Sequence, residues 1–311
     1  MSVAAIAAIA IALLSAALMG MAIQRGATCM VAAVDEVMTR RRYGRALALA
    51  EAAIWVGGLT AIAQLAGAFR MAPAGYAVTL WTLLGGLLLG LGAWVNRACV
   101  FGAVARIGSG QWAYFATPVG FFLGCLIPIG RTSAMHGPAL PFMHAALIAA
   151  GFSLLALWRL GEAVRAPDRL SHLWAPHRAT LLIAITFVTT MLTVGFWAYT
   201  DALAALAHAM DARLALRGAM VVALLAGAVA GGWIAGTIRP ERIRAVTVVR
   251  CLAGGALMGL GGMLVPGSND GLIMFGLPLL RPYAWVAVAT MALAIAASIA
   301  LAPRLAAMAH R

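Results

Sequence analysis

The feature that most restricts the fold of this chain is a series of apolar stretches, each long enough to cross a lipid bilayer. Nine of them occupy residues 2–23, 46–69, 76–94, 112–130, 141–163, 178–199, 216–238, 246–265 and 283–303. About twenty helical residues, at 1.5 Å each, cross the hydrocarbon core. The mean hydropathy of +0.98 and the 10% of charged residues exclude a water-soluble protein. The sequence therefore predicts an all-α polytopic membrane protein with about nine transmembrane helices.

Four further apolar segments are too short to cross the bilayer, at residues 24–38, 99–107, 201–210 and 268–277. We interpret them as short re-entrant helices, which enter and leave the membrane on one side. The first long stretch has Arg25 after it and no basic residue before it. This order favours a retained span, with cleavage as a signal peptide as the alternative.

The basic residues predict the orientation of the chain. All 22 are arginines, and only nine acidic residues oppose them. Because cytoplasmic loops collect positive charge, we assign the amino terminus to the periplasm and the carboxyl terminus to the cytoplasm of a bacterial inner membrane. This orientation places sixteen arginines inside and five outside. The arginines lie between apolar stretches rather than along one polar face, which argues against nucleic-acid binding.

The chain contains an internal duplication. GGLLLGLGAWVNRACVFG, from Gly85 to Gly102, aligns without a gap with GGALMGLGGMLVPGSNDG, from Gly254 to Gly271, about 170 positions later. The span count between the copies predicts that they face opposite ways, as in transporters built from inverted repeats. We expect a first repeat at 1–163, a cytoplasmic linker at 164–177 and a second repeat at 178–311, within one membrane domain.

Each copy of the motif has a break followed by a small polar side chain, Cys99 in the first and Ser268 in the second. If these residues start short helices, the helix amino termini form a weak anion site within the membrane. Thiols are suited to sulfur-bearing ligands. The predicted substrate path comprises Cys29, Cys99, Ser268, Asn269, Gly267, Arg97 and Arg25, with Gly92, Gly102, Gly261 and Gly271 flanking the breaks.

Each of these residues also has a purely structural interpretation. An isolated cysteine in a membrane helix usually only packs, and we assign that role to Cys125 and Cys251. Arg97 could serve only to set the orientation, and Asp270 would oppose an anion unless it is paired or lies toward the outer surface. The sequence has no nucleotide-binding loop and no metal-ligand spacing. We therefore expect no cofactor and no metal.

QRGATC at 24–29, GLGAWVNRACVFG at 90–102 and GGALMGLGGMLVPGSNDG at 254–271 resemble the YeeE/YedE family of sulphur transport membrane proteins. The resemblance implies an hourglass-shaped monomer of nine membrane helices with additional re-entrant ones. It also implies cysteines that pass thiosulfate along a central path by S–H···S hydrogen bonds, at positions matching Cys29 and Cys99. The family's third cysteine is replaced here by Ser268. A small cytoplasmic sulfur-carrier protein is an implied partner.

We therefore expect a permease, rather than an enzyme, for a small sulfur-containing anion such as thiosulfate. One alternative is a permease for a different small anion, because Ser268 replaces the family cysteine. Another is a sulfur-transfer protein that forms a persulfide on Cys99, with Arg97 stabilising the thiolate. A third is a membrane scaffold that does not transport.

Overall fold

The computed structural model describes residues 2–26, 28–68, 75–127, 134–135, 141–165, 176–208, 214–265 and 267–309. In these ranges the chain is helical apart from loops and two very short strands, β1 (Gly75–Tyr76) and β2 (Ala134–Met135). The strands pair antiparallel, with Gly75 opposite Met135. Most of the predicted linker at 164–177 lies outside the described residues.

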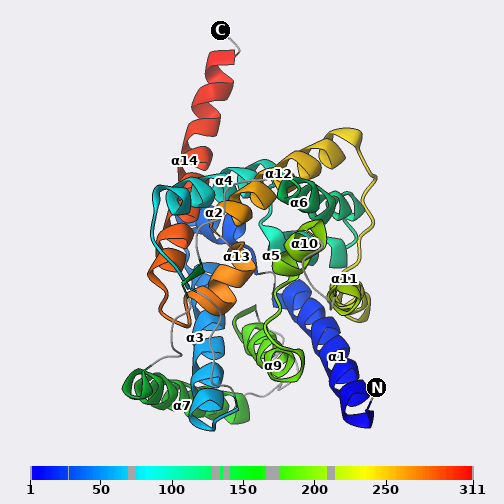
Figure 1. Ribbon diagram of the computed structural model, residues 1–311. Coiled ribbons are helices and arrows are strands. Elements are labelled where there is room, and N and C mark those ends of the chain that lie inside the picture. Colours follow the sequence, from blue (N-terminus) through cyan, green and yellow to red (C-terminus); the bar gives the residue numbers. More distant parts are fainter. Residues whose placement is uncertain are drawn as a thin grey trace.

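Each long apolar stretch of the sequence corresponds to a long helix or helix pair (Figure 1). These are α1 (Val3–Gly26), α3 (Gly44–Leu65), α4 (Leu80–Asn96), η1 (Trp112–Phe115) with α6 (Ala116–Cys125), α7 (Phe142–Arg165), α9 (Pro176–Val194), α11 (Leu214–Ile234), α12 (Ala245–Leu264) and α14 (Pro282–Ala309). The short segments form α2 (Met30–Arg40), α5 (Val100–Gly108), α10 (Tyr199–His208) and α13 (Asn269–Gly271), which continues into the π-helical turn η2 (Leu272–Gly276).

By length and composition, seven helical stretches of the described chain could cross a membrane. Three of them, Val3–Arg40, Leu80–Gly108 and Ala179–His208, each join a long helix to the short helix that follows it. Two further apolar stretches, Trp112–Cys125 and Met143–Arg159, are shorter. The chain is thus a multi-pass helical membrane protein, while the count of nine transmembrane helices stays a prediction.

The two copies of the duplicated motif pack against each other as α4 and α12. A β-carbon placed on Gly92 would lie 2.7 Å from the carbonyl oxygen of Gly254, and one on Gly254 would lie 2.6 Å from the carbonyl oxygen of Gly92. Gly85 and Gly261 approach each other in the same reciprocal way, at 2.8 and 2.7 Å. Only glycine permits this backbone approach, so the motif brings the two helices into direct contact.

The neighbouring helices repeat the pattern. Gly90 of α4 packs on α14, where its β-carbon would lie 2.6 Å from the carbonyl oxygen of Met291. Its counterpart in α12, Gly259, packs on α6, where its β-carbon would lie 2.2 Å from the carbonyl oxygen of Phe121. Figure 1 shows α14, α4, α12 and α6 in that order across the molecule. Equivalent glycines thus contact equivalent helices, as a two-fold axis between α4 and α12 would require.

The remaining helices pack around this row. A β-carbon on Gly227 of α11 would lie 1.9 Å from the carbonyl oxygen of Ala17 in α1, so these two helices also meet at a glycine. An ion pair between Glu51 of α3 and Arg159 of α7 joins two helices that lie side by side in Figure 1. Within the same packing, α1 also contacts α5 and α3 also contacts α2, the two short helices that follow the cysteines.

Candidate functional site

Two cysteines distant in the sequence meet in the interior. Cys29 immediately precedes α2 and Cys99 immediately precedes α5. Their sulfur atoms lie 3.8 Å apart, within hydrogen-bonding range for two thiols. The backbone N–H of Met30 donates to the sulfur of Cys99 at 3.3 Å. Both side chains are buried, so the thiols are shielded from bulk solvent.

The break between α4 and α5 is held by side-chain hydrogen bonds. Arg97 ends α4 in the left-handed conformation, with φ of 59°. The amide nitrogen of Asn96 donates to the carbonyl oxygen of Ala98 at 2.7 Å, and the hydroxyl of Thr117 donates to the amide oxygen of Asn96 at 3.0 Å. Because Asn96 is fully buried, these bonds fix the turn that presents Cys99.

The first turn of α5 leaves space for the thiol of Cys29. A β-carbon on Gly102 would lie 2.5 Å from the sulfur atom of Cys29, so no larger side chain fits without displacing that sulfur. The amino termini of α2 and α5 both meet the thiol pair. Unpaired N–H groups at helix amino termini carry partial positive charge and favour an anion. Arg106, at the other end of α5, also interacts electrostatically with Cys29.

The second break lies between α12 and α13. Gly267 has φ of 139°, a conformation that L side chains rarely adopt. Ser268 precedes α13, and both it and Asn269 are buried, with at most 1% of either exposed. The hydroxyl oxygen of Ser268 and both polar side-chain atoms of Asn269 have no hydrogen-bond partner in the described part of the chain. Buried polar groups usually have a partner, so these groups could bind a ligand or water.

Asp270 is buried and paired with neutral donors. Its carboxylate accepts a hydrogen bond from the backbone N–H of Thr200 at 3.0 Å and one from the hydroxyl of Thr200. It also accepts one from the backbone N–H of Gly271 at 2.9 Å. These neutral donors satisfy the hydrogen-bonding capacity of the carboxylate but do not balance its negative charge.

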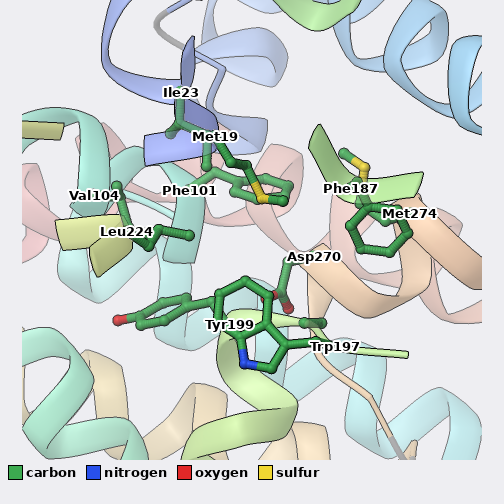
Figure 2. Close-up of a pocket in the computed structure, with 11 residues that line it drawn as sticks. Met19, Ile23, Phe101, Val104, Phe187, Trp197, Tyr199, Leu224, Asp270 and Met274 are labelled. Atoms are coloured by element: carbon green, nitrogen blue, oxygen red, sulfur yellow. The ribbon is translucent and has the colours of Figure 1, made fainter. Parts of the chain in front are cut away.

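A small cavity lies between the two breaks. Figure 2 shows the side chains around it, among them Phe101 of α5 and Asp270 of α13. Phe101 lies two residues after Cys99, and Asp270 lies two residues after Ser268. The other lining residues are mainly apolar or aromatic, including Trp197 and Met274. The cavity therefore adjoins both breaks through residues next to the predicted site residues.

The remaining predicted residues occupy varied positions. Arg97 lies at the first break and is exposed, and Arg25 lies in the last turn of α1 and is partly buried. Gly92 and Gly261 lie about one turn before the breaks, inside α4 and α12, where they serve helix packing. Gly102 and Gly271 lie in the short helices that follow the breaks. The residues with positive φ at the two breaks are Arg97 and Gly267.

Sequence reasoning missed four polar residues around the breaks. Asn96, Thr117 and Thr200 position the backbone or Asp270, and no spacing in the sequence signals these contacts. Thr28 is 3% exposed, and its hydroxyl oxygen has no hydrogen-bond partner among the described residues. Its place next to Cys29 could have identified it. No group of three or more His, Cys, Asp or Glu side chains in the described ranges could hold a metal ion.

The fold and its two buried breaks define a helical membrane protein with a polar site in its interior. The sequence model of the sulphur transport family, YeeE/YedE, matches residues 25–151 and 131–297. Each matched region contains one copy of the duplicated motif. The chain belongs to this family and is thus a sulfur-related membrane transporter. A comparison with curated protein sequences found no match.

Proposed function

We propose that the protein moves a small sulfur-containing anion such as thiosulfate across the inner membrane, along a path formed by Cys29, Cys99 and Ser268. The observation that carries this proposal is the pair of buried thiols, 3.8 Å apart, at the amino termini of two short helices. A soft thiol donates weakly and suits a sulfur-bearing anion. Two adjacent thiols can pass such an anion from one to the next without strong binding at either.

The second break supplies the oxygen and nitrogen hydrogen-bonding groups of the path, which are chemically harder than a thiol. The hydroxyl of Ser268 and the amide nitrogen of Asn269, which have no partner among the described residues, can donate hydrogen bonds to the oxygen atoms of a sulfur oxyanion. Gly267 supplies the positive φ of the turn that directly precedes these two residues. Arg25 and Arg97 add positive charge near the first break and would attract an anion toward it.

We also propose that the halves at 1–163 and 178–311 form an inverted repeat, with the amino terminus periplasmic and the carboxyl terminus cytoplasmic. The reciprocal contacts of Gly85 with Gly261 and of Gly92 with Gly254 support a two-fold relation between the halves. The arginine distribution supports the orientation. We propose a monomer as the transporting unit and a small cytoplasmic sulfur-carrier protein as its partner.

A second function is favoured by the N–H that Met30 donates to the sulfur atom of Cys99. This bond would stabilise a Cys99 thiolate. The thiolate could attack the outer sulfur atom of thiosulfate, form a persulfide and release sulfite as the S–S bond breaks. The protein would then transfer sulfur rather than transport an intact anion. A different small anion is a further alternative, because Ser268 replaces a cysteine of the family pattern.

Uptake of radiolabelled thiosulfate into vesicles containing the purified protein tests the proposal. Cys99→Ala should lower the uptake rate by about tenfold, the effect of losing a contact of about 1.4 kcal/mol. Cys125→Ala is the matched control, because Cys125 is equally buried but its thiol faces the carbonyl oxygen of Gly259 in α12. Undiminished uptake by Cys99→Ala would contradict the thiol path. Persulfide on Cys99 without uptake would favour sulfur transfer.

A further inference from the structure

A basic pocket lies beside the thiol pair and is distinct from the cavity between the breaks. It has a volume of about 550 Å³ and is lined by five arginines and one acidic residue, Glu241. The arginines are Arg97, Arg106, Arg242, Arg244 and Arg250. The first two belong to the α4–α5 region and the others to α12 and the loop before it. The pocket is thus formed jointly by the two sequence repeats.

The loop before α12 is attached to the loop after α5 by backbone hydrogen bonds. The N–H of Arg239 donates to the carbonyl oxygen of Ser109 at 3.0 Å, and the N–H of Glu241 donates to that of Gly110 at 3.3 Å. These bonds hold the loop that carries Arg242 and Arg244 against the end of α5. Both of these arginines therefore line the same pocket as Arg97 and Arg106. The packing of these two loops therefore brings the arginines of the pocket together.

Two of the guanidinium groups are oriented by uncharged partners. Arg106 donates to the amide oxygen of Gln111 at 3.0 Å and to the carbonyl oxygen of Arg97 at 3.2 Å. It also lies over the ring of Tyr114, 4.9 Å from its centre, while Arg250 donates to the hydroxyl of Tyr114 at 3.3 Å. One tyrosine thus holds two cations in the same pocket.

The pocket lacks the negative charge that would balance these cations. In the described part of the chain, no carboxylate lies within 4.0 Å of a side-chain nitrogen of any of the five arginines. Glu241 accepts instead from Gln111, at 2.6 Å. Like charges gathered in one pocket repel one another, and an anion bound among them removes that cost. Guanidinium groups also match the planar pairs of oxygens that oxyanions present.

We propose that this basic pocket is a second binding site, which takes a divalent tetrahedral oxyanion. This inference rests on the proposed function, because the pocket would bind the transported anion at one end of the thiol path. Arg97 lies two residues from Cys99, and Arg106 interacts electrostatically with Cys29. All five arginines are among those that the sequence assigns to the cytoplasmic side. The phosphodiester group of an acidic lipid is also a tetrahedral oxyanion, although it carries a single negative charge, and it is the alternative occupant.

Calorimetric titration of the full-length protein with thiosulfate and with sulfate tests the site. The variant is the double substitution Arg242→Gln with Arg244→Gln, since both side chains are exposed and have no carboxylate partner among the described residues. We expect affinity for both anions to fall by on the order of tenfold or more. The control is Arg40→Gln with Arg42→Gln, which removes the same charge from exposed positions outside the pocket and should leave affinity unchanged.

Native mass spectrometry separates the two occupants. If a lipid phosphate fills the pocket, phosphatidylglycerol is retained by the native protein, is lost from the Arg242 and Arg244 variant, and is not displaced by thiosulfate. If the free oxyanion fills it, thiosulfate competes with sulfate and the lipid has no effect. The proposal is overturned if the variant keeps native affinity for both anions and for the lipid.

The outcome is also separable from that of the thiol path. Cys99→Ala should abolish most uptake while leaving the calorimetric affinity of the pocket intact, because Cys99 does not line it. A transporter with a normal thiol path and no second site would show the same sensitivity of uptake to Cys99, but its anion affinity would not change on substitution of Arg242 and Arg244.

Discussion

At the scale of single residues, the site combines soft and hard hydrogen-bonding groups. Cys29 and Cys99 form a buried thiol pair, whereas Ser268 places a buried hydroxyl at the second break. A hydroxyl is a shorter and stronger donor than a thiol. We infer that the second break favours the oxygen atoms of an oxyanion more than its outer sulfur atom.

This difference leads to a prediction for Ser268→Cys. The larger, softer thiol should raise the uptake of thiosulfate relative to sulfate, because only thiosulfate offers an outer sulfur atom. The hydroxyl oxygen of Ser268 has no hydrogen-bond partner among the described residues, so the substitution breaks no hydrogen bond there. Competition between the two anions in vesicles measures the ratio. An unchanged ratio means that Ser268 does not set the selectivity.

At the scale of helices, glycine contacts decide how closely α4 and α12 approach. A β-carbon on Gly92 would meet the carbonyl oxygen of Gly254, the backbone nitrogen of Met258 and the side chain of Leu257, all within 3.0 Å. Backbone atoms cannot turn aside as a flexible side chain can. The helices would have to separate, which would move Asn96 and the break at Arg97 that follow on the same helix.

We therefore predict that Gly92→Ala destabilises the protein by about 1–3 kcal/mol, the usual cost of overpacking. Gly151→Ala is the matched control, because nothing lies within 4 Å of a β-carbon at that position in α7. It should be neutral or more stable by about 0.5–1 kcal/mol. The midpoint of thermal unfolding in detergent compares the two. Equal midpoints would show that α4 and α12 are less tightly packed than described.

At the scale of the whole molecule, the proposed orientation makes the two ends of the chain face opposite sides of the membrane. In Figure 1, α1 and the end of α14 lie at opposite ends of the molecule. The basic pocket would then lie on the cytoplasmic side of the molecule. The arginine distribution underlies this placement.

The orientation predicts the behaviour of fusion proteins. Green fluorescent protein fused after Arg311 should fluoresce, and alkaline phosphatase at the same position should be inactive, because only the cytoplasm allows the first and prevents the second. Alkaline phosphatase fused after Ala72, in the first predicted outer loop, should be active. Activity of the phosphatase after Arg311 would show the opposite orientation. The basic pocket would then lie on the periplasmic side.

The sequence alone determined the elements of this protein. Apolar runs are local patterns, so residues 246–265 predicted α12 (Ala245–Leu264) and residues 99–107 predicted α5 (Val100–Gly108) almost to the residue. The expectation that Cys99 and Ser268 directly precede short helices is confirmed for the same reason, since a break in an apolar run is visible locally.

Only the tertiary structure decided what meets at the breaks. Cys29 and Cys99 lie 70 residues apart, and no local pattern states that their sulfur atoms approach to 3.8 Å. The hydrogen bonds of Asn96 with Thr117 and of Asp270 with Thr200 join separate helices, so they depend on how α4, α6, α10 and α13 pack. The basic pocket also depends on this packing, because its arginines come from the α4–α5 region and from α12 with the loop before it. A sequence fixes such partners only through the packed fold, because hydrogen bonds and charges act between neighbours in space.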